Sequence, residues 1–201
     1  MVPIANGIAF ANKYKKNDNI VVAYLGDGGI NEGYVLEALN LAVVLKLPIL
    51  FVCENNLYAM STHVDRSHSA PIHQKVKAFG IKCEVIHNND FIKLDSVAKR
   101  FVEEVRLYKE PRFIEVRTYR HYGHSKNDLN LYRDKDEEKF WFEKDVMKIV
   151  EEELIKSKEL TQDDVNKLKE EYQAYIDSIA EDVINLPEHT EKDVLKHVYA
   201  E

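Results

Sequence analysis

The chain has 201 residues, 45% of them hydrophobic, and a formal net charge of −7. This length fits one domain, or one domain with an appendage, and the hydrophobic share is enough for a sizeable core. No apolar run is long enough to span a membrane, and no segment has the pattern of a secretory signal. We therefore expect a cytoplasmic protein that is not embedded in a membrane.

The charge distribution restricts the classes of ligand that we expect, and the cysteine positions indicate the redox state of the thiols. Residues 134–201 contain 10 Lys or Arg against 21 Asp or Glu, a charge of −11, whereas residues 1–133 contain 18 against 14, a charge of +4. A mildly basic body suits an anionic ligand, and the acidic remainder argues against nucleic acid as a partner. We interpret the acidic part as solvated helix faces. Cys53 and Cys83 fall in expected strands and are typical of buried, reduced thiols.

The first elements lead to a glycine turn. Residues 1–14 are typical of a helix. Residues 20–25 form an apolar, β-branched run, which predicts a strand buried on both faces. Gly26 to Gly29 (GDGG) follows at once, and three glycines around one carboxylate allow the backbone to approach a ligand closely.

A helix and a second strand follow this turn. A helix is expected to begin near Asn31 or Glu32, with apolar positions at helical spacing from Val35 to Val44, and Pro48 ends it. Residues 49–53 then predict a second buried strand, and the pair Asn55 and Asn56 stands where that strand ends.

The positions of Asp27 and Asn56 predict a binding site. In an open α/β sheet, ligands bind at the carboxyl ends of the strands, and both residues directly follow such ends. The helix beginning near Asn31 offers free N–H groups, which favour phosphate. Mg²⁺ takes oxygen ligands from protein, phosphate and water. A lone GDG turn is equally typical of an ordinary loop, but with Asn56 it indicates a metal-bound diphosphate.

The middle of the chain alternates helices and strands. Residues 57–70 are expected to form a polar loop. Its His63 and His68 have the chemistry of ligands or acid–base groups, but we expect exposed histidines without such a role. The following segments predict parallel βαβ units: a helix at 71–79 stopped by Gly80, a strand at 81–86, a helix at 91–108 and a strand at 113–116.

A second polar stretch, residues 117–128, follows the last predicted strand and should reach the same edge of the sheet. Arg120, His121, His124 and Lys126 make it cationic and rich in hydrogen-bond donors. That composition suits a diphosphate or a substrate carboxylate. A solvated surface loop is the alternative interpretation.

From Asp134 the sequence is helical. One apolar stripe runs from Val146 to Leu154, and Thr161 with Asp164 resembles a capping box for a further helix. The stripe of that helix, from Val165 to Val183, is typical of a core or subunit contact. We therefore divide the chain into an α/β domain at residues 1–133 and a helical C-terminal extension of the same domain at residues 134–201.

Several of these stretches resemble a known family. Asp27 and Asn56 are 29 positions apart, the spacing of the fingerprint of thiamin diphosphate enzymes. The stretches GDGGINEG, EALNLA, KLPILFVCENNLYAMST and RTYRHYGHSKND resemble the alpha subunit of the decarboxylating first component of 2-oxo acid dehydrogenases, of which pyruvate dehydrogenase is an example. The resemblance implies a partial thiamin diphosphate-binding fold of the pyrophosphate type, a parallel sheet flanked by helices, with a helical C-terminal extension.

The resemblance also implies roles for individual residues. Asp27, the side chain of Asn56 and the backbone carbonyl of Tyr58 would hold Mg²⁺. Three glycines would approach the diphosphate of the cofactor. His124 would contact the diphosphate and assist turnover, so it is the expected catalytic residue. Arg120 would order the loop at the cofactor and pair with a neighbouring carboxylate. The glycines are Gly26, Gly28 and Gly29.

The family implies an oxidoreductase that decarboxylates a 2-oxo acid and passes the acyl group to a lipoyl carrier. A beta subunit would complete the active site within a heterotetramer. Pyruvate is the first expected substrate, and acetoin and branched-chain acids stay open. In the family a long segment precedes the one that begins this chain, so we expect either a fragment or a split subunit. A non-catalytic assembly module and a transketolase-like enzyme are the alternatives.

Overall fold

A computed structural model describes residues 1–194, 196 and 198 of the chain. The chain divides into two compact units, Met1–Val150 and Glu151–Glu201. The boundary expected at residue 133 rests on composition rather than on compactness, and it stays a prediction.

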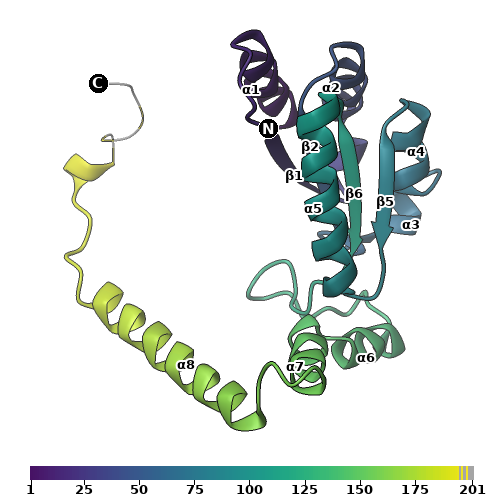
Figure 1. The fold of residues 1–201 in the computed structure, drawn as a ribbon. Coiled ribbons are helices and arrows are strands. Elements are labelled where there is room, and N and C mark those ends of the chain that lie inside the picture. The colour runs from purple at the N-terminus through teal and green to yellow at the C-terminus, as the bar shows by residue number, and fades with distance from the viewer. Residues whose placement is uncertain (195, 197, 199–201) are drawn as a thin grey trace. The chain divides into compact units, whose positions relative to one another are not determined.

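A four-stranded parallel sheet forms the centre of the first unit (Figure 1). Its strand order is β1-β2-β6-β5, so the second and third strands along the sheet are buried between neighbours. Because all four strands run in one direction, their carboxyl ends meet at a single edge. The predicted α/β class is confirmed. The strands are β1 (Val21–Gly26), β2 (Ile49–Asn55), β6 (Arg112–Arg117) and β5 (Lys82–Ile86).

One face of the sheet is covered by three helices. They are α1 (Val2–Tyr14), α2 (Gly33–Val44) and α4 (Ile72–Ala78). Alternate strand residues point to this face because side chains in a strand have a period of two. The core on this side is apolar and closely packed, and its fully buried members include Ile49, Phe51, Cys53, Phe113, Leu39 and Val76.

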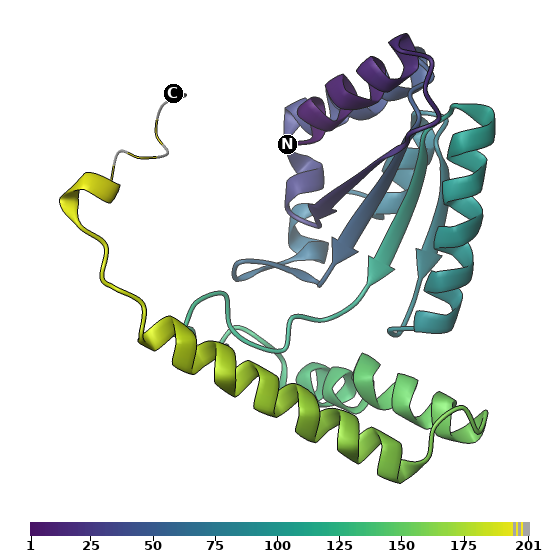
Figure 2. The same cartoon turned by 60° about the vertical axis from the view of Figure 1, so that its left-hand side comes forward.

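The other face carries α5 (Phe91–Tyr108), which has the predicted bounds. In Figure 2 the sheet lies between α1 and α2 on one side and α5 on the other. Phe101 of α5 packs against Leu50 and Ile114 of the two central strands. This helix leaves the edge strand β1 uncovered, so Val22 is 41% and Tyr24 is 63% exposed. The prediction that this strand is buried on both faces is wrong, because the helix on this face packs against β2, β6 and β5.

The segment predicted as a polar loop at residues 57–70 is more regular than expected. It contains a short antiparallel hairpin, β3 (Tyr58–Ala59) and β4 (Thr62–His63), followed by one helical turn, α3 (Val64–Ser67). His63 and His68 are half-buried rather than exposed, which corrects the expectation for both. His63 caps α3, because its Nδ1 accepts the Asp65 N–H at 3.2 Å. Two-residue strands are too short to show a periodic sequence pattern.

The predicted helical continuation is confirmed as three separate helices. They are α6 (Lys135–Glu143), α7 (Val146–Lys156) and α8 (Gln162–Ile184). Thr161 and Asp164 form the predicted capping box at the start of α8. Tyr172 and Ile176 on the apolar stripe of α8 are 63% and 57% exposed. Among the described residues, no helix is both long and apolar enough to cross a membrane.

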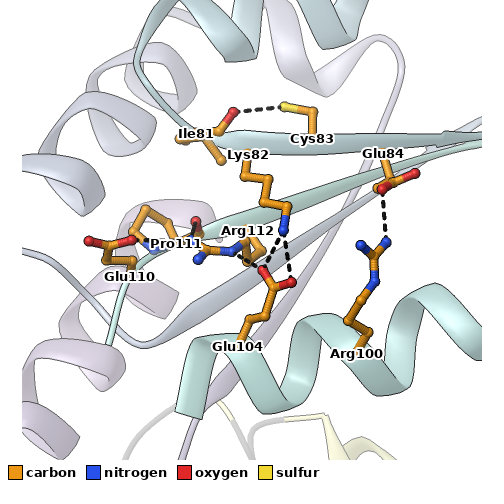
Figure 3. A network of polar contacts seen from close by, with 9 residues as sticks. All are labelled: Ile81, Lys82, Cys83, Glu84, Arg100, Glu104, Glu110, Pro111 and Arg112. Carbon is orange, nitrogen blue, oxygen red and sulfur yellow. Dashed lines mark hydrogen bonds and ion pairs between the residues drawn. The ribbon is translucent and has the colours of Figure 1, made fainter. Parts of the chain in front are cut away.

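A network of ion pairs fixes the amino-terminal end of the sheet (Figure 3). Glu104 on α5 accepts from Arg112 Nε at 2.7 Å and from Lys82 Nζ at 2.8 Å. Its side chain is only 16% exposed, and that of Arg112 is 9% exposed. Burial raises the pKa of Glu104, but the hydrogen bonds from Lys82 and Arg112 outweigh it and hold the pKa below 4.5. The network therefore ties α5 to β5 and β6.

We expect Glu104→Gln to lower the free energy of unfolding by about 1–2 kcal/mol at pH 7, since the pair is partly shielded from water. A pKa lowered in the folded state stabilises it above pH 4.5, and this stabilisation is lost as the pH falls further. Urea denaturation at several pH values measures the difference. Asp95→Asn, which removes an exposed pair on the same helix, is the control and should change stability by less than about 0.5 kcal/mol. A constant cost for Glu104→Gln down to pH 3 would contradict this assignment.

Candidate functional site

Three loops leave the carboxyl edge of the sheet and contact one another. The first is the GDGG turn after β1, the second runs from Asn55 to Met60 after β2, and the third runs from Thr118 to Arg133 after β6. The parallel register places Gly26 beside Glu54 and Asn55 beside Arg117, so the three loops start at neighbouring points. The predicted site residues lie on these loops.

Asp27 is the buried acid of the site. It is 2% exposed, and its Oδ2 atom has no hydrogen-bond partner among the described residues. Burial raises its pKa, and this effect exceeds the opposing effects of backbone hydrogen bonds from Asp27 and Asn56 and of the charges of His68 and Arg120. A buried carboxylate oxygen without a partner destabilises the protein unless a cation or donor binds it. The position is therefore suited to a metal ion.

The glycines of the turn have different surroundings. A Cβ atom on Gly28 would lie 2.6 Å from Cβ of Ala59, so only glycine allows the turn and the β3–β4 hairpin to pack this closely. Nothing lies within 4 Å of a Cβ built on Gly26 or Gly29. Gly28 thus joins two loops, and the other two glycines leave open backbone. A short 3-10 helix, η1 (Gly29–Asn31), lies between this turn and α2.

Asn56 and Tyr58 lie on a tight turn. The Oδ1 atom of Asn56 accepts the Tyr58 N–H at 3.2 Å, and the Oδ1 atom of Asn55 accepts the Leu57 N–H at the same distance. Leu57, between them, has a φ of 72°, in the left-handed region. Non-glycine residues adopt this region at a cost of about 1 kcal/mol or more, so other contacts must hold the turn. The turn presents the amide of Asn56 and the carbonyl of Tyr58 on one short segment.

Arg120 joins the second and third loops. It donates from Nη1 to the Tyr58 carbonyl at 3.4 Å and from Nη2 to the Met60 carbonyl at 2.7 Å. Its Nε donates to the Tyr122 carbonyl at 3.1 Å. The sequence predicted a neighbouring carboxylate as its partner, whereas the described residues give it carbonyl partners and the Tyr132 hydroxyl. The guanidinium therefore lies at the carbonyl expected to hold the metal.

His124 lies on an exposed part of the third loop. Its backbone N–H donates to Asp128 Oδ2 at 2.8 Å, and the Tyr132 hydroxyl donates to the same oxygen at 2.6 Å. These bonds and one from the Asn130 backbone lower the pKa of Asp128 to about 2. Gly123 is required here, because a Cβ would lie 2.5 Å from the Asp128 carbonyl. The loop is thus held by its own contacts and leaves the imidazole of His124 accessible.

A cluster of aromatic rings packs behind the second and third loops. Tyr58 and Tyr119 both donate their hydroxyl protons to Glu137 Oε1, at 2.9 and 3.1 Å. The Arg133 guanidinium lies over both rings, and its Nη1 donates to the Arg120 carbonyl at 2.6 Å. The cluster therefore fixes the backbone on which Tyr58 and Arg120 lie.

Two further residues lie beside the site: His68, for which the sequence predicted no role, and Glu115, which the sequence analysis missed. His68 has its Nε2 atom 2.9 Å from the Asp27 carbonyl oxygen, and burial lowers its pKa. Glu115 on β6 is fully buried and contacts Asn55, His73 and Arg117. Burial raises its pKa, but the Asn55 hydrogen bond and Arg117 outweigh this effect and leave the pKa lowered. The sequence does carry one signal for Glu115, because it is a single acid inside the apolar run FIEV of a predicted strand.

A cavity of about 570 Å³ opens beside these residues. Its lining combines apolar residues with polar ones of both charges, and the polar ones include Asn55, His68, His87, Glu115 and Arg117. Among the described residues, no three His, Cys, Asp or Glu side chains form a metal-binding group. The expected set of Asp27, one amide and one carbonyl is of a different kind, because it relies on diphosphate and water for the remaining ligands.

Comparison with known proteins identifies related sequences. The family model described as "Dehydrogenase E1 component" matches residues 1–192. The alpha subunit of the pyruvate dehydrogenase E1 component from Rickettsia felis is 35% identical over 199 residues, which are 98% of this chain and 61% of the relative. The subunit from Rhizobium meliloti is 38% identical over 172 residues, 85% of this chain and 49% of the relative. The human testis-specific form is 33% identical over 98% of this chain and 51% of its own length.

We expect Gly28→Ala to destabilise the protein by about 1–3 kcal/mol, because the new methyl group collides with Ala59. Gly29→Ala, in the same turn, meets open space and should change the free energy of unfolding by less than about 1 kcal/mol. Adding Ala59→Gly to Gly28→Ala should recover most of the loss. Chemical denaturation measures all three variants. Equal effects of the two alanine substitutions would contradict the close packing of the loops.

Without metal, Asp27→Asn should raise the free energy of unfolding by about 1 kcal/mol at pH 7, since it removes a buried charge. Because folding raises the pKa of Asp27, the contribution of this residue to stability is fully present below pH 3.8, its ordinary pKa. That contribution is lost as the pH rises through the pKa of the folded state. The advantage of the variant should therefore shrink at low pH. Thermal unfolding in a chelator measures it, and a less stable variant at pH 7 would contradict the assignment.

Proposed function

Because the chain belongs to the dehydrogenase E1 component family, we propose that it is the alpha subunit of a thiamin diphosphate- and Mg²⁺-dependent 2-oxo acid dehydrogenase. One observation carries the proposal: the buried carboxylate of Asp27, with one oxygen unpartnered, stands against the turn that bears Asn56 and Tyr58. The chain spans about 61% of the length of the Rickettsia relatives, so the activity, substrate and partners are part of the proposal.

The described residues fit the diphosphate end of the cofactor. Asp27, the Asn56 side chain and the Tyr58 carbonyl would hold Mg²⁺, since a hard cation prefers such oxygen ligands. Gly26 and Gly29 leave open backbone next to them, where a diphosphate can approach. The Asn56 amide oxygen has one lone pair engaged by the Tyr58 N–H and one remaining for a metal.

Two basic residues would act on the diphosphate and the substrate beside the cation. Arg120 places positive charge at the Tyr58 carbonyl, where it would balance diphosphate charge and keep the second loop in place. The accessible imidazole of His124 is free to hydrogen-bond a diphosphate oxygen or to move a proton at the substrate. Bound thiamin diphosphate supplies the electron sink that decarboxylation of a 2-oxo acid requires.

Pyruvate is the proposed substrate, because the relatives are named pyruvate dehydrogenase subunits. Acetoin and branched-chain 2-oxo acids are the alternatives. A beta subunit would complete the active site in a heterotetramer, a lipoyl carrier would accept the acyl group, and the assembly would work in the cytoplasm.

A non-catalytic assembly module is the second candidate function. It is favoured by the open apolar face of β1, where Val22 and Tyr24 line a groove of about 420 Å³. Such a face is typical of a surface that another polypeptide covers. This candidate predicts folding and assembly without cofactor binding.

Calorimetric titration of the purified chain with thiamin diphosphate and Mg²⁺, alone and with a candidate beta subunit, separates the two functions. The alpha-subunit proposal predicts Mg²⁺-dependent binding, at least with the partner present. Asp27→Ala should abolish that binding with little loss of folded structure, because the residue contributes a ligand rather than apolar packing. The control is Asp95→Asn on the distant α5, which should bind as the parent does. Absent binding in both conditions would favour the assembly module, whereas unchanged affinity in Asp27→Ala would contradict the metal role of Asp27.

A further inference from the structure

Glu115 is fully buried, yet its carboxylate has a complete set of partners. Its Oε1 accepts from Asn55 Nδ2 at 2.9 Å and from Arg117 Nε at 3.1 Å. Its Oε2 accepts the His73 backbone N–H at 3.1 Å and lies 3.1 Å from Nδ1 of the His73 ring. Phe113, two residues earlier on the same face of β6, belongs to the apolar core. Because removing one partner of such a buried charge is costly, the geometry around Glu115 is strongly fixed.

Asn55 transmits this fixed geometry to the next turn. Its side-chain amide is planar, so a hydrogen bond from Nδ2 to Glu115 also sets the direction of Oδ1. That oxygen accepts the Leu57 N–H at 3.2 Å and supports the left-handed conformation of Leu57. The Asn55 carbonyl is held by the Thr118 N–H at 3.0 Å, so the residue is fixed at both its backbone and its side chain.

We propose that Glu115 is a positioning residue for the cation site, acting through Asn55 on the turn that carries Asn56 and the Tyr58 carbonyl. The inference rests on the proposed function for its metal, although the turn itself is a property of this chain. Packing alone does not require an acid here, since buried ion pairs are often replaced by apolar residues without loss of stability. The carboxylate is needed because Asn55 Nδ2 and the His73 N–H both require an acceptor.

Glu115→Gln tests the inference, because a glutamine amide has one acceptor and one donor side. With its oxygen toward His73, the amide sets its NH₂ against two donors, Asn55 Nδ2 and Arg117 Nε. With its oxygen toward Asn55, its NH₂ meets the His73 N–H and has the His73 Nδ1 as its one acceptor on that side. The double substitution Asn55→Asp with Glu115→Gln restores the pattern: the glutamine NH₂ donates to the aspartate, and its oxygen accepts from His73. The other aspartate oxygen accepts from Leu57. Arg117, which pairs with position 55 in the sheet register, can follow the moved charge.

Two measurements on the full chain report the effect. Amide hydrogen exchange of Leu57 in the metal-free protein reports the turn directly. Binding of Mn²⁺ with thiamin diphosphate, followed by electron paramagnetic resonance with and without a candidate beta subunit, reports the cation site. Glu104→Gln is the matched control, because it alters a shielded carboxylate at the opposite end of β6.

We expect Glu115→Gln to speed Leu57 exchange and to weaken Mn²⁺ binding by at least about tenfold each, as for residues that orient metal ligands. The double substitution should recover both to within about threefold of the parent, and Glu104→Gln should change neither. If Glu115→Gln fails to fold, Asn55→Ala should give the same two losses.

Unchanged Leu57 exchange in Glu115→Gln, or no recovery in the double substitution, would overturn the positioning role. If instead the parent chain binds no Mn²⁺ with thiamin diphosphate in either condition, the proposed function fails. The exchange measurement still decides the role of Glu115 in that case, so the two failures are distinguishable.

Discussion

The buried carboxylate of Asp27 is the constraint to which the rest of the site responds. Water does not reach its Oδ2, and the described residues offer that atom no donor. Burying a charge in this way is unfavourable unless the group is protonated or binds a cation. The raised pKa of Asp27 shows that burial favours the protonated form. A divalent cation provides the second outcome. The turn that begins at Asn56, whose backbone donates to Asp27, carries an amide and a carbonyl, which are ligand types that Mg²⁺ prefers.

The architecture keeps this arrangement in place with contacts that do not involve the carboxylate itself. Parallel strands bring the loop starts to one edge, and Gly28 permits contact between the first two loops. Arg120 links the second loop to the third through backbone carbonyls. Glu115 fixes the second loop from within the core. Rigid elements thus hold a turn that is locally strained, as at many binding sites.

The sequence predicts the elements with strong periodic patterns. The amphipathic helix α5 has the predicted bounds, since Asp90 caps its start and Pro111 follows its end. The exposed face of β1 depends on sheet order, which no local pattern encodes. The β3–β4 hairpin is too short for a pattern. Glu115 is visible as an acid in an apolar strand, but its partner Asn55 lies 60 residues away, so only the structure shows the pair.

The most direct test of this account is a crystal structure of the full chain with a candidate beta subunit, thiamin diphosphate and Mn²⁺, in which anomalous scattering locates the cation. The account predicts one cation about 2.1 Å from the Asp27 carboxylate and the Asn56 amide oxygen, with diphosphate oxygens completing its shell. A cation and diphosphate bound elsewhere, with the Asp27 and Asn56 side chains turned away from each other, would contradict it.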